Sequence, residues 1–156
     1  MALPPCGLYR TTAAVAGIPA GRLVYFHNHG NPGAGLYLPQ TWTLNRAQWN
    51  TQGHTLPDEA SAASLVKLPD EGLYVVRQTF HCCEKKCVEY PAQQLVQLGY
   101  DGEATPLLFI PEFSARGLGF PERGQKLEAA HFAKLELLRV ATARGAEAAP
   151  RDAFVH

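Results

Sequence analysis

Short runs of apolar and aromatic residues, separated by glycine, proline and asparagine, follow one another along the first half of the chain. Such runs between turn-forming residues indicate β-strands. The turn sequence Asn-His-Gly-Asn-Pro-Gly at 28–33 joins two of these runs as a hairpin. Acidic residues at the start of 58–65 favour one or two helical turns there. The pattern predicts strands at 7–12, 23–27 and 36–38, and a fourth short strand around Trp49.

The same pattern occurs twice. The motif Leu-Pro-x-x-Gly-Leu-Tyr at residues 3–9 recurs at residues 68–74. Residues 19–39 align with residues 91–111 without a gap, and seven of the 21 positions are identical. A repeat of this kind is the signature of a duplicated structural unit. We therefore predict that the chain contains an internal duplication.

The duplication divides the chain into three parts. We expect a β-rich repeat 1 at residues 1–67, a β-rich repeat 2 at residues 68–140, and a C-terminal tail at residues 141–156. A seven-residue insertion lies in repeat 2 between Tyr74 and Pro91. A unit of about 65 residues is marginally stable alone. Two such units should therefore share a core or a large interface.

The expected fold class is mainly β, as a β-rich α+β protein with two tandem SH3-like or bent-sheet repeats and a short helical turn in each. Residues 128–143, taken alone, predict one long helix. The matching segment of repeat 1 must end before Pro69, so we expect residues 135–140 to be extended. Gly30 and Gly102 are expected to supply equivalent turns with positive φ.

Composition and charge narrow the class of protein. Hydrophobic residues make up 46% and charged residues 18%, which is typical of a packed protein. The 14 basic and 14 acidic side chains balance, so nucleic acid and anionic membrane are poor partners. No apolar run reaches the length of a membrane helix, and the first residues lack the pattern of a signal peptide. We expect a cytoplasmic protein whose four cysteines stay reduced.

The insertion in repeat 2 contains four candidate metal ligands. Cys83 and Cys87 have the spacing of one zinc-binding pair, but a second cysteine pair is absent, so Cys6 or a distant histidine would have to contribute. A disulfide is an alternative use of the thiols. The favoured interpretation is a solvated hairpin tip, with no metal and no cofactor. The four residues are His81, Cys82, Cys83 and Cys87.

A second asymmetric feature is His27-Asn28-His29, which stands opposite Gly99-Tyr100-Asp101 in the repeat alignment. Alternate residues of a strand point to one face, so the two imidazoles could hold a metal ion together. No carboxylate or third histidine lies near them in the sequence. A polar turn is therefore the favoured interpretation.

Signatures of catalysis are absent, since the sequence has no Gly-x-Ser-x-Gly, no P-loop and no dinucleotide fingerprint. We therefore expect a non-catalytic protein-interaction or structural subunit of a larger assembly, with a protein partner or a second copy of the chain bound to it. Trp42 is a candidate interface anchor, and Phe154 and Val155 are candidates in the tail. The alternative is a metal- or thiol-dependent protein, zinc-binding or redox-sensing, that uses the cysteine hairpin of repeat 2.

Overall fold

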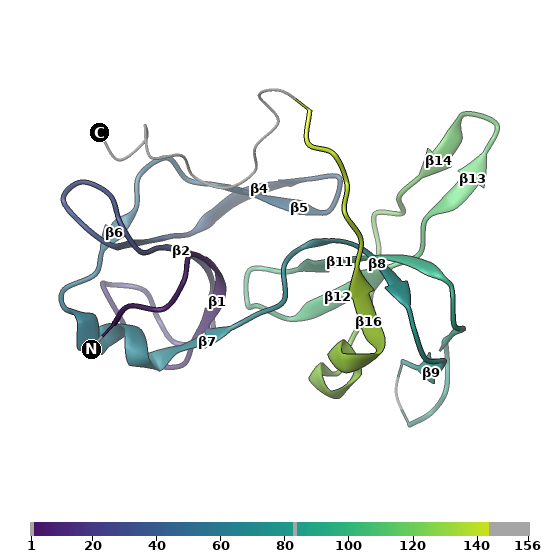
Figure 1. Cartoon of the computed structure of the whole chain (residues 1–156), viewed down its shortest axis with the longest axis horizontal. Coiled ribbons are helices and arrows are strands. Elements are labelled where there is room, and N and C mark those ends of the chain that lie inside the picture. Colours follow the sequence, from purple (N-terminus) through teal and green to yellow (C-terminus); the bar gives the residue numbers. More distant parts are fainter. Residues whose placement is uncertain (1, 83, 144–156) are drawn as a thin grey trace.

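The computed structural model describes residues 2–82 and 84–143, which form two β-rich lobes joined near β7 (Figure 1). Strands predominate in this part of the chain, and its helices are two short 3₁₀ turns. None of these described helices has the length and apolarity to cross a bilayer. The mainly β class predicted from the alternation of apolar runs and turns is confirmed.

The first sheet has five antiparallel strands in the order β6-β3-β2-β1-β7. Its last strand follows a 3₁₀ turn, η1 (Glu59–Ser64), whose N-cap Asp58 accepts a hydrogen bond from the Ser61 amide at 2.8 Å. This cap satisfies one of the amides that a helix start leaves unpaired. The strands are β1 (Gly7–Thr11), β2 (Leu23–His27), β3 (Gly35–Tyr37), β6 (His54–Thr55) and β7 (Leu65–Lys67).

The second sheet also has five antiparallel strands, in the order β15-β12-β11-β8-β16. A 3₁₀ turn, η2 (Ala129–Lys134), again precedes the last strand. The expectation that residues following this turn are extended agrees with the position of β16. The strands are β8 (Gly72–Val76), β11 (Leu95–Tyr100), β12 (Pro106–Phe109), β15 (Gln125–Lys126) and β16 (Leu135–Leu137).

Strand pairing has the same register in both sheets. Gly7 pairs with Phe26 in the first sheet, and Gly72 pairs with Leu98 in the second. The tyrosine two residues after each glycine donates a hydrogen bond to a backbone carbonyl four residues before it. These bonds run from Tyr9 to the Pro5 carbonyl at 2.7 Å and from Tyr74 to the Asp70 carbonyl at 2.6 Å. The residues that the sequence alignment matches therefore occupy equivalent places in the two sheets.

In the described part of the chain, three two-stranded hairpins lie outside the two five-stranded sheets. The first, β4 (Pro39–Thr43) with β5 (Arg46–Trp49), belongs to the first lobe, and the second, β13 (Glu112–Ser114) with β14 (Gly117–Gly119), belongs to the second. The third pairs β9 (Phe80–His81) with β10 (Glu89–Tyr90) and carries the seven-residue insertion. Pro39 begins β4, with one residue between it and the end of β3.

The prediction of a glycine with positive φ in equivalent turns is correct for the first lobe and wrong for the second. Gly30 has a φ of 135°, as predicted, but Gly102 lies outside the left-handed region. In the second lobe the positive φ belongs to Ala104, at 63°. Asp101 makes this turn instead, because its Oδ1 atom accepts hydrogen bonds from the Glu103 and Thr105 amides, both at 2.9 Å.

The two lobes share hydrophobic packing. One cluster of buried side chains, including Tyr9, Phe26 and Leu36, lies within the first lobe. A larger cluster fills the second lobe and also includes Leu8 and Ala47 from the first. The Leu23 amide donates a hydrogen bond to the Gly102 carbonyl at 3.0 Å across the same boundary. These contacts form an interface between the two lobes.

Candidate functional site

The β4–β5 hairpin of the first lobe is seated on the second sheet (Figure 1). Trp42 donates a hydrogen bond from its indole nitrogen to the Tyr100 carbonyl at 2.8 Å. Asn45 donates from Nδ2 to Gln97 Oε1 at 2.9 Å, and Gln97 donates from Nε2 to the Leu44 carbonyl at 2.8 Å. The hairpin is thus attached to the neighbouring sheet by both backbone and side-chain hydrogen bonds.

The second sheet has residues shaped to receive this hairpin. Ala47 is fully buried, and its amide donates a hydrogen bond to Glu71 Oε2 at 3.0 Å. A Cβ atom added to Gly99 would lie only 2.7 Å from the Asn45 carbonyl oxygen, so glycine is required for the close approach. Burial raises the pKa of the Glu71 carboxyl to about 7, against smaller lowering effects from the Ala47 hydrogen bond and from Arg46.

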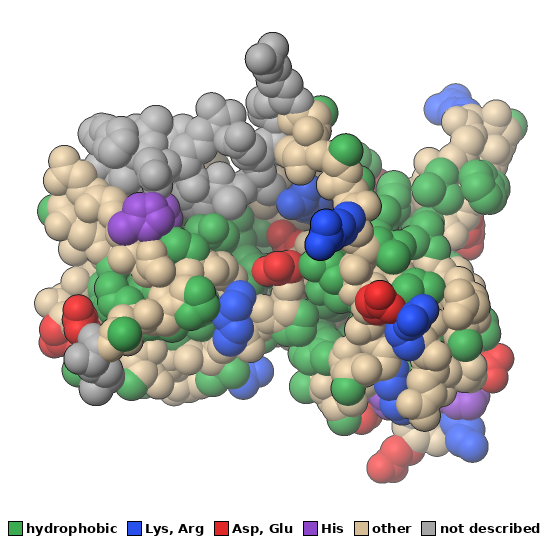
Figure 2. Space-filling view, viewed as in Figure 1, with side chains coloured by type: hydrophobic (Ala, Val, Ile, Leu, Met, Phe, Trp, Pro, Cys, Tyr) green, Lys and Arg blue, Asp and Glu red, His purple; other side chains and the backbone are tan. Residues whose placement is uncertain are grey.

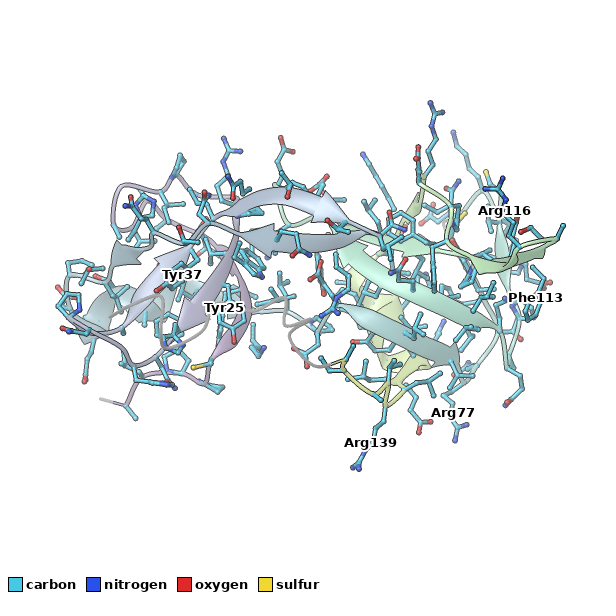
Figure 3. The ribbon with its side chains drawn as sticks, turned by 90° about the horizontal axis from the view of Figure 1, so that it is seen from above. Tyr25, Tyr37, Arg77, Phe113, Arg116 and Arg139 are labelled. Atoms are coloured by element: carbon cyan, nitrogen blue, oxygen red, sulfur yellow. The ribbon has the colours of Figure 1, made fainter. Side chains whose placement is uncertain are left out.

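The β13–β14 hairpin of the second lobe does not pack on a neighbouring sheet among the described residues. It projects from the body of the molecule (Figure 1), and hydrophobic side chains gather along it in the space-filling view (Figure 2). The Phe113 side chain is 86% exposed and Leu118 is 46% exposed. Phe113 and Arg116 lie at the end of the molecule opposite Tyr25 and Tyr37 of the first sheet (Figure 3).

The two hairpins carry equivalent cross-strand pairs. Trp42 faces Ala47 in β4–β5, and Phe113 faces Leu118 in β13–β14. The first pair contacts the neighbouring sheet, where Ala47 is fully buried. The second pair is apolar and largely exposed. Exposed apolar side chains that are adjacent in a sheet are typical of interaction sites.

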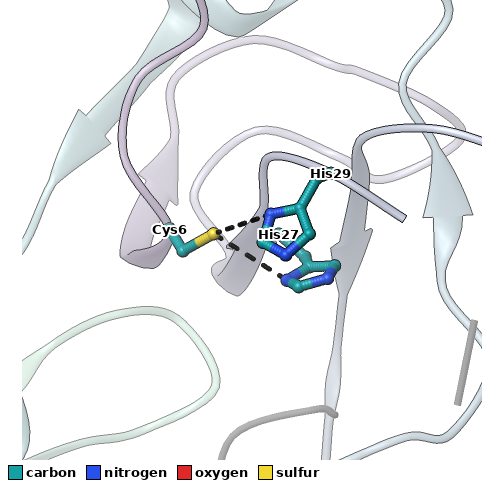
Figure 4. Close-up of side chains that lie close together, drawn as sticks. All are labelled: Cys6, His27 and His29. Carbon is teal, nitrogen blue, oxygen red and sulfur yellow. Dashed lines mark hydrogen bonds between the residues drawn. The ribbon is translucent and has the colours of Figure 1, made fainter. Parts of the chain in front are cut away.

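A separate cluster lies on the first sheet, where Cys6, His27 and His29 converge (Figure 4). The Cys6 Sγ atom lies 3.8 Å from His27 Nδ1 and 3.9 Å from His29 Nδ1. The two imidazole rings are 4.1 Å apart between centroids. Their ligand atoms and the sulfur all lie within 4.8 Å of one another. His27 is buried, Cys6 half-buried and His29 exposed, so the cluster opens to solvent on one side.

Asn28 holds the cluster together. Its backbone N–H donates a hydrogen bond to Cys6 Sγ at 3.2 Å, and its side-chain Oδ1 lies 3.2 Å from the same sulfur. The Oδ1 atom is also 2.8 Å from His29 Nδ1. The Asn28 side-chain Nδ2 donates a hydrogen bond to the Pro4 carbonyl at 3.2 Å, and this bond fixes the orientation of the side chain. The position of the sulfur between the imidazoles therefore depends on one asparagine.

The cysteine hairpin of the second lobe is arranged differently. Cys82 is buried in the core beside Phe80 and Tyr90, and its sulfur accepts a hydrogen bond from the Val88 amide at 3.3 Å. Cys87 is exposed, and Cys83 lies outside the described residues. His81 Nε2 is 3.8 Å from a Glu89 carboxylate oxygen. Within residues 2–82 and 84–143, these side chains do not meet as a group of three metal-ligand types.

The interface residues predicted from sequence fall in different places. Trp42 is 41% exposed, although its indole nitrogen is bonded to the second sheet. Phe154 and Val155 lie outside the described residues. Phe113 was not among the residues predicted from sequence. The sequence interpretation also did not connect Cys6 with the His27 and His29 pair. The strand pairing of Gly7 with Phe26 is what brings Cys6 beside His27.

In comparisons with protein-family models, curated proteins and solved structures, the chain matches none of them.

Proposed function

We propose that this chain is a non-catalytic subunit that binds a partner protein through its β13–β14 hairpin. The observation that carries the proposal is the exposure of Phe113 and Leu118 at the positions where the first hairpin holds Trp42 and Ala47. The first pair packs on a neighbouring sheet of the same chain. The second pair has the same cross-strand geometry and an apolar surface suited to a similar seat on another protein.

The proposal includes an internal duplication of a small SH3-like unit. Equal strand order, equal pairing register and a 3₁₀ turn before the last strand support it. In each unit a hairpin is inserted between the third and fourth strands of the sheet in chain order. In a tandem arrangement each hairpin reaches forward to the next unit. The hairpin of the second unit has no further sheet to contact among the described residues, so it is available to a sheet supplied by a partner.

The partner is a different protein rather than a second copy of this chain. In a dimer of this kind, the β13–β14 hairpin of one copy would pack on the first sheet of the other, as β4–β5 packs on the second sheet. It would then meet His27 at the position that Gly99 occupies in the second sheet. At Gly99 even one added Cβ atom would lie 2.7 Å from the docked backbone. Self-association of this kind would therefore require the hairpin to move away. A partner sheet with a glycine or another small residue at this place fits the hairpin.

The test uses the full chain with a photo-cross-linking amino acid at position 113, expressed in its own cells. We expect one main protein adduct. Purified partner should then bind the wild-type chain, and the variant Phe113→Ser should bind about 10- to 100-fold more weakly, because burial of a phenylalanine contributes about 1.5–3 kcal/mol. The matched control is Val66→Ser, which changes an apolar side chain that is 41% exposed on β7.

Two results would contradict the proposal. One is equal binding by Phe113→Ser and Val66→Ser. The other is a cross-linked adduct whose mass is twice that of the chain, together with dimers or longer oligomers in sedimentation, since these would show that the hairpin binds a second copy.

A further inference from the structure

We propose that Cys6, His27 and His29 form a binding site for a single zinc ion on the first sheet. The inference concerns the lobe opposite the β13–β14 hairpin and does not rest on the proposed docking function. Thiolate sulfur and imidazole nitrogen are the ligand atoms that zinc prefers in proteins. Three such side chains, drawn from two segments that are distant in the sequence, meet here at one point.

The two sulfur–nitrogen distances fit a zinc ion after a small adjustment. With zinc-sulfur bonds of about 2.3 Å and zinc-nitrogen bonds of about 2.0–2.1 Å, a tetrahedral centre places sulfur and nitrogen about 3.6 Å apart. The Cys6 sulfur lies 3.8 Å from the His27 nitrogen and 3.9 Å from the His29 nitrogen. Closing each gap requires a shift of about 0.2–0.3 Å. Exposed His29 can supply much of it by rotating its side chain.

The surroundings of the cluster suit a metal site. The Asn28 backbone N–H donates to the Cys6 sulfur at 3.2 Å, and such a bond to a ligand atom fixes its position and tunes the metal. His29 is on the exposed side, which gives an ion a path from solvent. When zinc binds, the Cys6 thiol gives up its proton to solvent and the sulfur bonds the metal as a thiolate. The proton that His29 Nδ1 shares with Asn28 Oδ1 moves to Nε2, so that a neutral imidazole presents Nδ1 to the metal.

The site has three protein ligands and a fourth position that Asn28 Oδ1 or water can take. Asn28 Oδ1 lies 3.2 Å from the sulfur and 2.8 Å from His29 Nδ1, so it is adjacent to two of the three ligand atoms. A three-ligand zinc site keeps an exchangeable fourth position, whereas a structural site with four strong ligands does not. We therefore expect zinc to bind reversibly, and not to be needed for the chain to fold.

The asymmetry between the lobes supports a dedicated role for these residues. The equivalent positions in the second sheet hold Glu71, Gly99 and Asp101. Glu71 and Gly99 receive the β4–β5 hairpin there, and Asp101 makes a turn. Because the same fold forms without the thiol and the two imidazoles, the fold itself does not require them in the first lobe.

The test is metal titration of the purified full chain after treatment with a chelator. Cobalt(II) should bind with one equivalent per chain and give the near-ultraviolet absorption of a thiolate-to-cobalt transition, which zinc then removes. Cys6→Ser should abolish that absorption and weaken zinc binding at least about 100-fold, since even residues behind the ligands change affinity by about 10–100-fold. His29→Ala should weaken zinc binding similarly. The matched controls Cys87→Ser and His131→Ala should bind as the wild type does.

Zinc X-ray absorption on the wild-type chain keeps the test independent of how the variants fold. It should report one sulfur and two imidazole nitrogens bound to the metal. Binding of less than one equivalent by the wild type, or a shell without sulfur or with two sulfurs, would overturn the proposal. So would loss of binding in Cys87→Ser together with retention in Cys6→Ser, because the metal would then belong to the cysteine hairpin.

Discussion

Replacing Glu71 with glutamine should stabilise the protein above neutral pH and leave its stability unchanged in acid. The Glu71 carboxyl lies between the lobes, where burial raises its pKa from 4.5 to about 7. Its Oε2 atom accepts the Ala47 amide at 3.0 Å, and a glutamine oxygen can accept the same bond. The substitution therefore removes the charge and keeps the contact with the β4–β5 hairpin.

The sign and magnitude follow from the pKa. The folded chain holds the Glu71 proton more tightly than the unfolded chain does, so this group favours the folded state in acid. The stabilisation is fully present below about pH 4.5 and is lost as the pH rises through about 7. The difference between these two pKa values corresponds to ~3 kcal/mol. Because Glu71 is only partly buried by surface area, solvent screening reduces the expected effect to about 2–3 kcal/mol.

The assay is urea unfolding, followed by tryptophan fluorescence, at a series of pH values from about 4.5 to 8.5. The difference in unfolding free energy between Glu71→Gln and wild type should be near zero in acid and grow to about 2–3 kcal/mol above pH 7. Subtracting the two proteins cancels the titration of the histidines. Glu112→Gln, at an exposed carboxylate on β13, is the matched control. Parallel curves for wild type and Glu71→Gln would refute the assignment.

Two further predictions test the lobe interface and the equivalence of the lobes. Gly99→Ala should destabilise the chain by about 1–3 kcal/mol, because the added Cβ would lie 2.7 Å from a docked carbonyl oxygen; Gly33→Ala, which meets nothing within 4 Å, is the control in thermal melts. Tyr9→Phe and Tyr74→Phe should each cost about 0.5–1.5 kcal/mol in urea unfolding, because each removes one equivalent hydrogen bond to a carbonyl. A loss confined to one of the two tyrosines would contradict the equivalence of their environments.

The strands were the most predictable part of the structure, for a local reason. β2 has the bounds expected from the run Leu-Val-Tyr-Phe-His, since apolar and β-branched residues between turn formers favour a strand wherever they occur. The segment after η2 is more instructive. Its helix-forming residues alone favour a helix, yet β16 occupies Leu135–Leu137. Comparison with the matching residues of the first lobe identified the extended segment, because pairing with β8 outweighs a weak local preference for helix.

The candidate sites were less predictable, because each depends on contacts between distant segments. Cys6 and His27 are 21 residues apart in the chain, and the pairing of β1 with β2 brings them together. A search of neighbouring residues for a third ligand could not find it. The exposure of Phe113 was hidden for the opposite reason. Trp42 contacts the sheet that follows its own lobe, and the described residues form no further five-stranded sheet for the β13–β14 hairpin to contact.

One pair of sheet positions explains how two similar lobes can have different uses. In the second sheet, Glu71 accepts the Ala47 amide and Gly99 leaves room for the Asn45 carbonyl, so the hairpin of the preceding lobe can sit there. In the first sheet, the same two places hold Cys6 and His27. A glycine at the second place permits docking but carries no ligand atom, whereas an imidazole there can bind a metal but obstructs docking. A single position cannot serve both purposes well. Under the proposed duplication, therefore, the first sheet has the proposed metal site at the place where the second sheet receives a hairpin, and we propose that the hairpin of the second lobe binds a partner protein.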